Sequence, residues 1–268
     1  MGVRLVVLLL FALFFAGPLV WLLLVPTKSG QQLLSSGSFS FGSFHHVWAA
    51  WKQLDSFNGH MFRRWLANSL LYTFAATALT MITVIPAGYG LAFGRFPGRR
   101  LILGVTLVAM VMPPATLVLP IFLELNAVRL IGTAFSVILP FAFFPFGVYL
   151  AYLYYSTALP AAIFDAARVD GCGEWQSFIR IAVPLARPAV AYVFFFAFVA
   201  DWNNFFLPYV LLDDSTKFPV QVGLSDILQG SSGVVALAAI IASAPVAVVF
   251  VVSQRALVRG LLSGTTVG

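Results

Sequence analysis

The sequence predicts an all-α membrane protein with six transmembrane helices, which form a single domain over residues 1-268. Hydrophobic residues make up 61% of the chain and charged residues only 9%, whereas a soluble domain carries about 25% charged residues. Lipid is therefore the expected solvent for most of the surface. Six apolar stretches are nearly free of charge, and each is as long as the ~20 residues that cross a ~30 Å hydrocarbon core. Their residues are 5–27, 65–94, 101–123, 130–164, 188–212 and 227–254.

The distribution of positive charge predicts how these stretches are oriented. The net charge is +6, but Arg and Lys are scattered at the ends of apolar stretches, which suits membrane orientation and argues against a nucleic-acid partner. If both termini are cytoplasmic, nine positive residues lie on that side: Arg4, Arg95, Arg99, Arg100, Arg168, Arg180, Arg187, Arg255 and Arg259. The outer side then holds six: Lys28, Lys52, Arg63, Arg64, Arg129 and Lys217. We therefore predict a multi-pass cell-membrane protein with both termini cytoplasmic.

The first stretch follows Arg4 and has the charge pattern of a signal peptide, but its length and the lack of a small-residue cleavage pattern favour a retained helix. The external loop after it, residues 28-64, contains the aromatic run FSFGSFHHVWAAWKQL. We interpret this run either as an interfacial segment with Phe and Trp at headgroup depth or as a surface that seats a binding protein. The three His of this loop lack a metal-site spacing, and the single Cys172 excludes an intrachain disulfide.

The second and third stretches contain residues that shape helix packing. Gly90 and Gly94 form a small-xxx-small pair that would let another helix approach closely. The run RFPGRR after them stops the helix with a proline and anchors it inside with arginines. Pro113 and Pro114 remove two amide donors at membrane depth, so we expect a kink or an unwound turn there, with a structural or a gating role.

Asp201 is the one acid inside an otherwise apolar stretch, and Trp202, Asn203 and Asn204 follow it. An ionisable group in a span costs about 2.5–3.5 kcal/mol on insertion scales unless it faces a polar interior or a partner. These residues are therefore candidates for a translocation path, where amides would bond hydroxyl groups and an indole face would stack on a sugar ring. A helix-packing hydrogen bond, or a helix end that bends out of the membrane, explains them equally well.

A polar segment between the fourth and fifth stretches predicts a helix–turn–helix hairpin. Pro160 precedes an Ala-rich run in which Asp165 falls in the early turns, where a carboxylate is favourable against the helix dipole. Gly171 can adopt the left-handed conformation that ends a helix. Residues 174–181 then predict a second short amphipathic helix that stops before Pro184. Small Ala side chains would let a partner pack closely, and Asp165 would pair with an arginine of that partner.

The spacing in this segment resembles the cytoplasmic EAA loop of ABC-importer permeases. Asp stands where Glu is usual in that loop, and Val183 stands where Leu is usual. The resemblance implies an ATPase-coupling loop over residues 157-188, with the coupling residues Asp165, Ala166, Ala167, Asp170, Gly171, Ile181 and Pro184.

The C-terminal end is similar to the tail of the maltose-type smaller channel subunit, which belongs to the carbohydrate branch of these permeases. The residues of this tail that the resemblance places in contact with the ATPase are Gln254, Arg255, Arg259 and Gly260. NSL at residues 68–70 and WNNF at residues 202–205 also resemble segments of that branch, the latter with Asn where an acid is common.

The resemblance implies a type I ABC-importer permease with a core of about 65-257, which imports a sugar or oligosaccharide and forms half of the translocation path. Its partners would be a second homologous permease subunit, two ATP-binding cassette ATPase subunits, an extracytoplasmic solute-binding protein and membrane lipid. The chain has no G-x-x-x-x-G-K-[ST] phosphate loop. ATP and Mg would therefore bind to the ATPase subunits, and we expect no cofactor, metal or catalytic residue on this chain.

Two alternative functions are left open by the sequence. An ABC permease for an amino acid, a phosphate ester or a metal oxyanion would have a similar loop, and only the tail argues against it. An intramembrane enzyme or an ion-coupled carrier belongs to a different class. The apolar stretches contain one acid and no His, and no inverted repeat is visible, which disfavours both.

Overall fold

The computed structural model describes the backbone of residues 2–263, and the side chains of the same range except residues 256 and 258–263. Every regular element in these residues is a helix. The chain forms two compact units, of which unit 1 comprises Met1–Asn68 and Phe218–Pro245, and unit 2 comprises Ser69–Lys217 and Val246–Gly268. Two long helices, α4 (Met61–Phe93) and α15 (Ser232–Ser263), contribute to both units. The two units share these helices, so a single domain over residues 1-268 stays a prediction.

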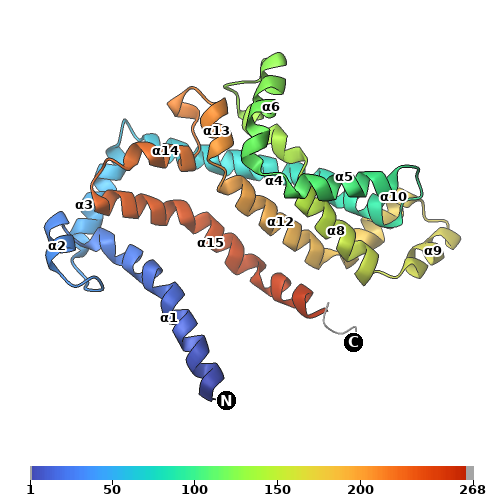
Figure 1. The fold of residues 1–268 in the computed structure, drawn as a ribbon, viewed down its shortest axis with the longest axis horizontal. Coiled ribbons are helices and arrows are strands. Elements are labelled where there is room, and N and C mark those ends of the chain that lie inside the picture. Colours follow the sequence, from blue (N-terminus) through green and yellow to red (C-terminus); the bar gives the residue numbers. More distant parts are fainter. Residues whose placement is uncertain (1, 264–268) are drawn as a thin grey trace. The chain divides into compact units, whose positions relative to one another are not determined.

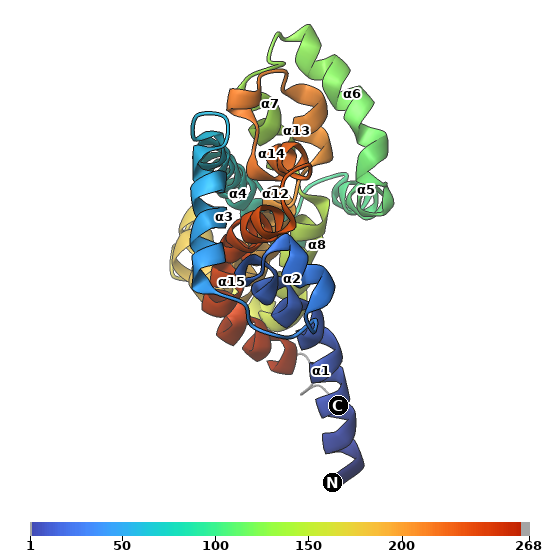
Figure 2. The same ribbon diagram turned by 90° about the vertical axis from the view of Figure 1, so that its left-hand side faces the viewer.

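Unit 1 begins with a long apolar helix that leads into a small helical lobe. None of the α1 side chains is buried, as expected for a helix whose solvent is lipid. Figures 1 and 2 show α2 and α3 in blue near the end of α1. On α14, a Cβ atom at Gly223 would lie 2.1 Å from the ring of the buried Trp65, so only glycine lets α14 approach α4 so closely. The remaining elements of unit 1 are α1 (Gly2–Leu24), η1 (Val25–Thr27), α2 (Gly30–Ser35), α3 (Phe44–Ser56) and α14 (Val220–Ile227).

Unit 2 packs the other helices around α4 and α8. Helix α8 contacts α5 on one side and α12 on another, and α13 packs against α6 and α7 (Figure 1). Its elements up to α8 are α5 (Arg99–Val111), α6 (Pro114–Ala127), α7 (Ala134–Ile138), η2 (Leu139–Ala142) and α8 (Pro145–Ala158). They are followed by α9 (Ala161–Val169), α10 (Glu174–Ser177), the π-helical segment η3 (Phe178–Ala182), α11 (Val183–Leu185), α12 (Arg187–Trp202), α13 (Phe206–Leu211) and η4 (Ser215–Lys217).

The helices confirm a membrane protein with several spans. Four stretches in the described residues are long and apolar enough to cross a membrane: Gly2–Thr27, Met61–Phe93, Ala134–Ala158 and Ser232–Arg255. Two bent pairs meet the same criteria when each pair is taken as one span, namely Arg99–Val111 with Pro114–Ala127, and Glu174–Leu185 with Arg187–Trp202. The number of spans therefore lies between four and six.

The predicted kink in the third apolar stretch is confirmed, and it is sharp. The chain bends by 110° between α5 and α6. Pro114 is the first residue of α6, a position where the missing backbone N–H is not needed. Pro113 before it has an extended backbone, which ends α5 and starts α6 in a new direction.

The close helix approach occurs at a different glycine from the pair expected. A Cβ atom at Gly90 would meet nothing within 4 Å, and one at Gly94 would meet the carbonyl oxygen of Gly90 and the Phe96 ring. At Gly88, by contrast, a Cβ atom would lie 2.4 Å from the Cβ of Ala151 and 2.9 Å from the backbone nitrogen of Tyr152. Gly88 thus allows α4 and α8 to pack backbone to backbone.

We expect Gly88→Ala to destabilise unit 2 by about 1–3 kcal/mol, because the new methyl group would overlap backbone atoms of α8 that cannot move aside. Gly90→Ala is the matched control, since it adds the same methyl group to the same helix in open space and gains about 1 kcal/mol of helix propensity. Thermal unfolding of the two purified variants in detergent measures the difference. Equal stability of both variants would show that the α4–α8 approach is not tight.

Candidate functional site

The polar segment forms the predicted helix–turn–helix hairpin, which comprises residues 161–185 (Figure 1). Helix α9 ends in a turn where Gly171 has a φ of +82°. The N–H of Gly171 donates to the carbonyl of Arg168 at 3.0 Å, and the N–H of Cys172 donates to that of Ala167 at 2.9 Å. This pair of bonds is the Schellman arrangement that ends a helix with glycine. The sequence prediction for Gly171 is therefore confirmed.

Asp165 lies in the second turn of α9, which begins at Ala161, in agreement with the predicted early turns. The end of the second helix differs from the prediction. The second helix does not stop before Pro184 but continues through η3 to Leu185. The widened π-turn lets the N–H of Val183 bond to Phe178 five residues back, and Pro184 then falls in the first turn of α11, where it has no donor to supply. The chain bends by 80° between α11 and α12.

Three charged side chains form an ion-pair clamp across the Gly171 turn: Asp165, Arg168 and Glu174. Arg168 donates from Nη1 to Oδ1 of Asp165 at 2.8 Å and from Nε to Oε1 of Glu174 at 3.0 Å. The hydrogen bond and charge of Glu174, followed by those of Asp165, raise the pKa of Arg168, so the guanidinium stays protonated. The clamp therefore joins α9 to α10 within one chain, and Asp165 already has an arginine partner of its own.

An aromatic cluster fastens the hairpin to the rest of unit 2. Its members are Tyr89, Phe93, Tyr155, Phe164 and Phe178. The ring centroids of Phe93 and Phe164 lie 4.3 Å apart, and those of Tyr89 and Phe178 lie 5.2 Å apart. Phe164 comes from α9 and Phe178 from η3, so both arms of the hairpin are anchored to the same end of α4. Because four of these rings are buried and Phe93 is half-buried against them, the hairpin is held as a packed element.

The predicted coupling residues divide between this anchored side and an exposed side. Ala167 is buried and Ile181 packs against the core, so both help to hold the hairpin. The exposed members are Asp165, Ala166, Asp170, Gly171 and Pro184. Large apolar side chains accompany them, since Val169 is 89% exposed and Trp175 is 67% exposed. A charged and apolar surface of this kind on a polar loop is typical of a protein-docking site.

Asp201 lies near the far end of α12, about 20 Å from Arg187 at 1.5 Å per residue. Its Oδ2 accepts a hydrogen bond from Thr77 of α4 at 3.0 Å, and its Oδ1 is buried with no partner in the described part of the chain. Trp202 is buried and stacks on Phe198 with ring centroids 5.9 Å apart. These contacts support a helix-packing role for both side chains, and a role in a path stays a prediction.

The two asparagines that follow are more accessible. Asn203 is exposed and donates from Nδ2 to the carbonyl of Val199 at 2.9 Å. The Oδ1 of Asn204 accepts from the N–H of Leu207 at 3.4 Å, which helps to start α13. Of the four path candidates, Asn203 is therefore the side chain that the structure leaves most available to a solute.

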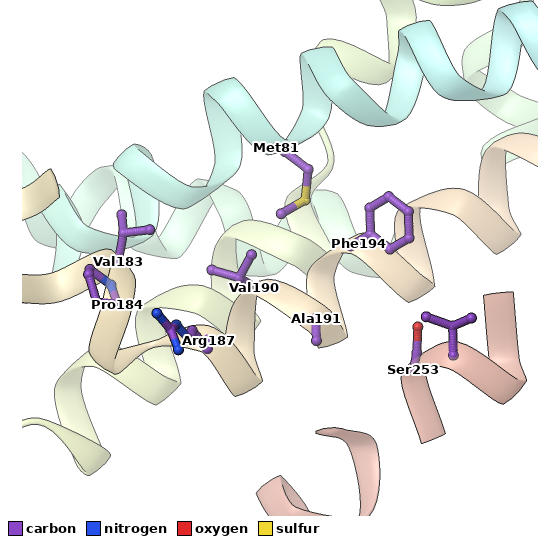
Figure 3. A pocket seen from close by; sticks show the side chains of 9 residues that line it. Met81, Val183, Pro184, Arg187, Val190, Ala191, Phe194 and Ser253 are labelled. Atoms are coloured by element: carbon purple, nitrogen blue, oxygen red, sulfur yellow. The ribbon is translucent and has the colours of Figure 1, made fainter. Parts of the chain in front are cut away.

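A cavity of about 510 Å³ lies between α4, α11, α12 and the end of α15 (Figure 3). Its walls are mostly apolar, and Arg187 is the charged residue among them. The lining residues are Met81, Val183, Pro184, Arg187, Val190, Ala191, Phe194, Val252 and Ser253. The structure thus brings Pro184 of the hairpin and the start of the C-terminal tail to one cavity.

The C-terminal tail is described only in part. Gln254 and Arg255 are exposed, and Gln254 donates from Nε2 to the carbonyl of Val251 at 2.9 Å. The hydroxyl of Tyr192 donates to the carbonyl of Leu257, which ties α15 to α12. Arg259 and Gly260 have side-chain positions outside the described residues.

Comparisons with known proteins identify the family. The family described as binding-protein-dependent transport system inner membrane component matches residues 84–263, which include the hairpin, the Asp201 group and the tail. The chain belongs to this family. The match confirms the resemblance to ABC-importer permeases and a location in the membrane. Membership implies a solute-binding protein and an ATPase as partners.

Relatives of this inner-membrane-component family match the chain over nearly its whole length. The diacetylchitobiose uptake system permease protein NgcG of Streptomyces coelicolor is 30% identical over 96% of this chain and 86% of its own. The arabinooligosaccharides transport system permease protein AraQ of Bacillus subtilis is 31% identical over 97% and 93%. A chain in the crystal structure of a bacterial ABC transporter for the acidic polysaccharide alginate has a TM-score of 0.81 at 26% identity, with 94% of each chain covered.

Sequence reasoning missed the residues that make the hairpin rigid. Arg168 stands three residues after Asp165, a spacing that places their side chains on one helix face, and this signal predicts their ion pair. The second bond to Glu174 depends on the turn at Gly171 and has no local signal. Phe164 and Phe178 lie within the loop 157-188, but their joint packing on Tyr89 required the fold.

We expect Arg168→Gln to loosen the turn, because it removes the charge that joins α9 to α10. Cys172 lies in this turn and is the free cysteine of the chain, so its labelling rate by a thiol reagent reports the change. Labelling of the purified Arg168→Gln protein should become a few-fold faster. Arg168→Lys should give an intermediate rate, because an ammonium keeps the charge but cannot bond Asp165 and Glu174 with the geometry of a guanidinium. Arg180→Gln, which removes an exposed arginine outside the clamp, is the control. An unchanged rate in Arg168→Gln would show that the clamp does not order the turn.

Proposed function

We propose that this chain is a permease subunit of an ATP-driven importer for a sugar or oligosaccharide. The observation that carries the proposal is full-length similarity to permease proteins named for diacetylchitobiose and arabino-oligosaccharides, together with a fold shared with a transporter of alginate. All three named solutes are saccharides. The tail and the WNNF segment favour the same branch. An importer of a non-sugar solute is the alternative.

The hairpin is proposed to dock the ATPase subunit. Its exposed side presents Asp165 and Ala166 next to the apolar Val169 and Trp175, and its buried side is fastened to α4 and α12. A rigid projection of this kind can pass a movement of the ATPase to the membrane helices, because the packed aromatic rings cannot slide independently. Gln254 and Arg255 are proposed to add a second contact with the ATPase.

The membrane part is proposed to have six spans, with each bent helix pair counted as one span. In this arrangement the hairpin and both termini are cytoplasmic, and the lobe before α4 lies outside. This chain and a second permease subunit would each supply half of the path, with Asp201, Trp202, Asn203 and Asn204 near its wall. Two ATPase subunits would bind ATP and Mg, and a solute-binding protein would deliver the sugar from outside.

The transported solute is tested with the complete transporter, reconstituted in vesicles with its ATPase, second permease and binding protein. Labelled mono- and disaccharides are offered beside amino acids and phosphate esters, and ATP is supplied on the ATPase side. We expect ATP-dependent uptake of at least one saccharide. Uptake of an amino acid or phosphate ester with no uptake of any saccharide would replace the sugar assignment and keep the permease assignment.

We expect Gly171→Ala to impair coupling, because a side chain at positive φ costs roughly 1 kcal/mol or more and shifts the turn that orients α9 against α10. Gly173→Ala is the matched control. A Cβ atom meets nothing within 4 Å at either glycine, and Gly173 has an ordinary φ of −69°. Saccharide uptake and retention of the ATPase during purification should both fall in Gly171→Ala and stay near the parent level in Gly173→Ala. Equal uptake by both variants would mean that the turn has no role in coupling.

The orientation of the chain is tested by the labelling of single cysteines on intact cells with a membrane-impermeant thiol reagent. Cys172 lies in the hairpin, so the parent protein should stay unlabelled if the hairpin is cytoplasmic. In a Cys172→Ser background, Ser35→Cys in the lobe should label, and Pro97→Cys in the turn before α5 should not. Labelling of Cys172 without labelling at position 35 would reverse the topology and remove the argument for ATPase docking at the hairpin.

A further inference from the structure

The lobe of unit 1, residues 25–60, is held between two candidate membrane spans. Helix α1 runs into it at Val25, and α4 leaves it at Met61. Because each of these helices is long and apolar enough to cross the membrane, the lobe between them lies on one side of the bilayer and close to its surface.

Hydrogen bonds tie the lobe to the end of the first span. The N–H of Gly42 donates to Oγ1 of Thr27 at 3.0 Å, and the N–H of Ser43 donates to the carbonyl of Thr27 at 2.6 Å. Nδ1 of His46 lies 3.1 Å from the same carbonyl oxygen. Residues 42–46 are therefore fixed at the depth where the apolar helix ends.

A buried lysine fixes the loop that precedes these residues. Lys28 is only 6% exposed, and its ammonium donates to the carbonyls of Gly37 at 2.7 Å and Ser38 at 3.1 Å. The ammonium thereby supplies a donor to the Ser38 carbonyl and adds to the bonds that the Gly37 carbonyl accepts from Ser40. These bonds hold the loop of Gly37 and Ser38 against the residue that follows η1.

Four aromatic side chains are exposed at this depth. Phe39 is 63% exposed, Phe41 53%, Phe44 76% and Trp48 59%. The rings of Phe41 and Phe44 lie 5.0 Å apart, and Nζ of Lys52 lies 5.6 Å from the centroid of the Trp48 ring. The Phe41–Phe44 contact and the four-residue spacing of Phe44 and Trp48 bring three of these side chains together, with a lysine beside Trp48.

Helix α3 separates three environments around its axis. Ala50 and Leu54 mark its buried face. Phe44 and Trp48 are four residues apart and share one exposed row, whereas Gln53 lies roughly 180° around the axis from Phe44 at ~100° per residue. The helix thus has a protein face, an aromatic edge and a polar edge, which is the pattern of a helix lying in the membrane–water interface.

We propose that Phe39, Phe41, Phe44 and Trp48 form a lipid anchor that inserts into the headgroup layer beside the end of α1, with Lys52 at the level of the lipid phosphates. Aromatic side chains concentrate at this depth in membrane proteins, and a lysine next to them can reach the phosphate layer. A lipid surface fits better than a soluble binding protein, because the surface sits at the depth where the span ends and is apolar rather than mixed. The anchor fixes the depth of α1 and α4 together.

The test uses a fluorescent label at one position of α3 in the complete transporter. Phe44→Cys in the Cys172→Ser background is labelled with an environment-sensitive nitrobenzoxadiazole dye and reconstituted in phosphatidylcholine–phosphatidylglycerol vesicles. Gln53→Cys on the polar edge is the matched control. Headgroup-attached nitroxide lipids should quench the label at position 44 several-fold more than the label at position 53. Aqueous iodide should quench the label at position 53 more than the label at position 44.

Each other outcome overturns the anchor. Equal iodide quenching at both positions would place the aromatic surface in water. Protection of position 44 that appears only when the binding protein is added would make the partner a protein. Protection from both quenchers without that protein would mean that another subunit covers the surface. If Phe44→Cys does not assemble, Phe41→Cys gives the same comparison, because its ring packs against that of Phe44.

Discussion

The packing of Phe164 and Phe178 on Tyr89 is the contact on which the organisation of unit 2 depends. The two phenylalanines come from opposite arms of the hairpin, and the tyrosine comes from α4. Phe93 adds a second ring contact to Phe164, so both arms of the hairpin pack on the last turns of α4. With these contacts, the hairpin is part of the same buried core as Ala151, Ala182 and Val193. A force on the exposed side of α9 must therefore move α4 or separate rings that are packed at close-packed density.

The clamp and the glycine turn complete this arrangement in different ways. Gly171 sets the direction of the chain, because few other residues adopt a φ of +82° without strain. The Arg168 bridge then adds directional bonds on the exposed side, where solvent and salt weaken each ion pair. The buried rings hold the hairpin rigidly on α4, and the exposed charges orient α9 relative to α10. This division leaves Asp165 and its neighbours accessible while the backbone beneath them stays fixed.

Much of this structure could be predicted from the sequence, because a lipid environment requires long apolar helices whose backbone groups are hydrogen-bonded within the chain. The apolar stretches, the kink at Pro113 and Pro114, and the glycine turn were predicted because each follows from local chemistry. The helix approach at Gly88 could not be predicted in the same way, since Gly88 and Gly90 differ only in which face meets α8. The extension of the second arm past Pro184 also depended on the π-turn at η3, which has no sequence rule. The contact between Glu174 and Arg168 arises only once the turn is formed.

The role of Asp201 depends on a contact between two helices that are distant in the sequence. From the sequence, an acid at this position is costly and has three explanations: a solute path, a helix-packing hydrogen bond, or a helix end that leaves the membrane. The structure supplies Thr77 as a partner for one oxygen, which joins α12 to α4, the same helix that carries Tyr89. Helix α4 therefore contacts the hairpin at its C-terminal end through aromatic rings and contacts α12 at its middle, where Thr77 bonds the Asp201 carboxylate. Because α12 continues from the hairpin through the 80° bend, the two helices and the hairpin form a closed loop of contacts. A displacement of the hairpin cannot be absorbed by α12 alone, since the Thr77–Asp201 bond and the aromatic cluster hold α4 to both ends of that loop.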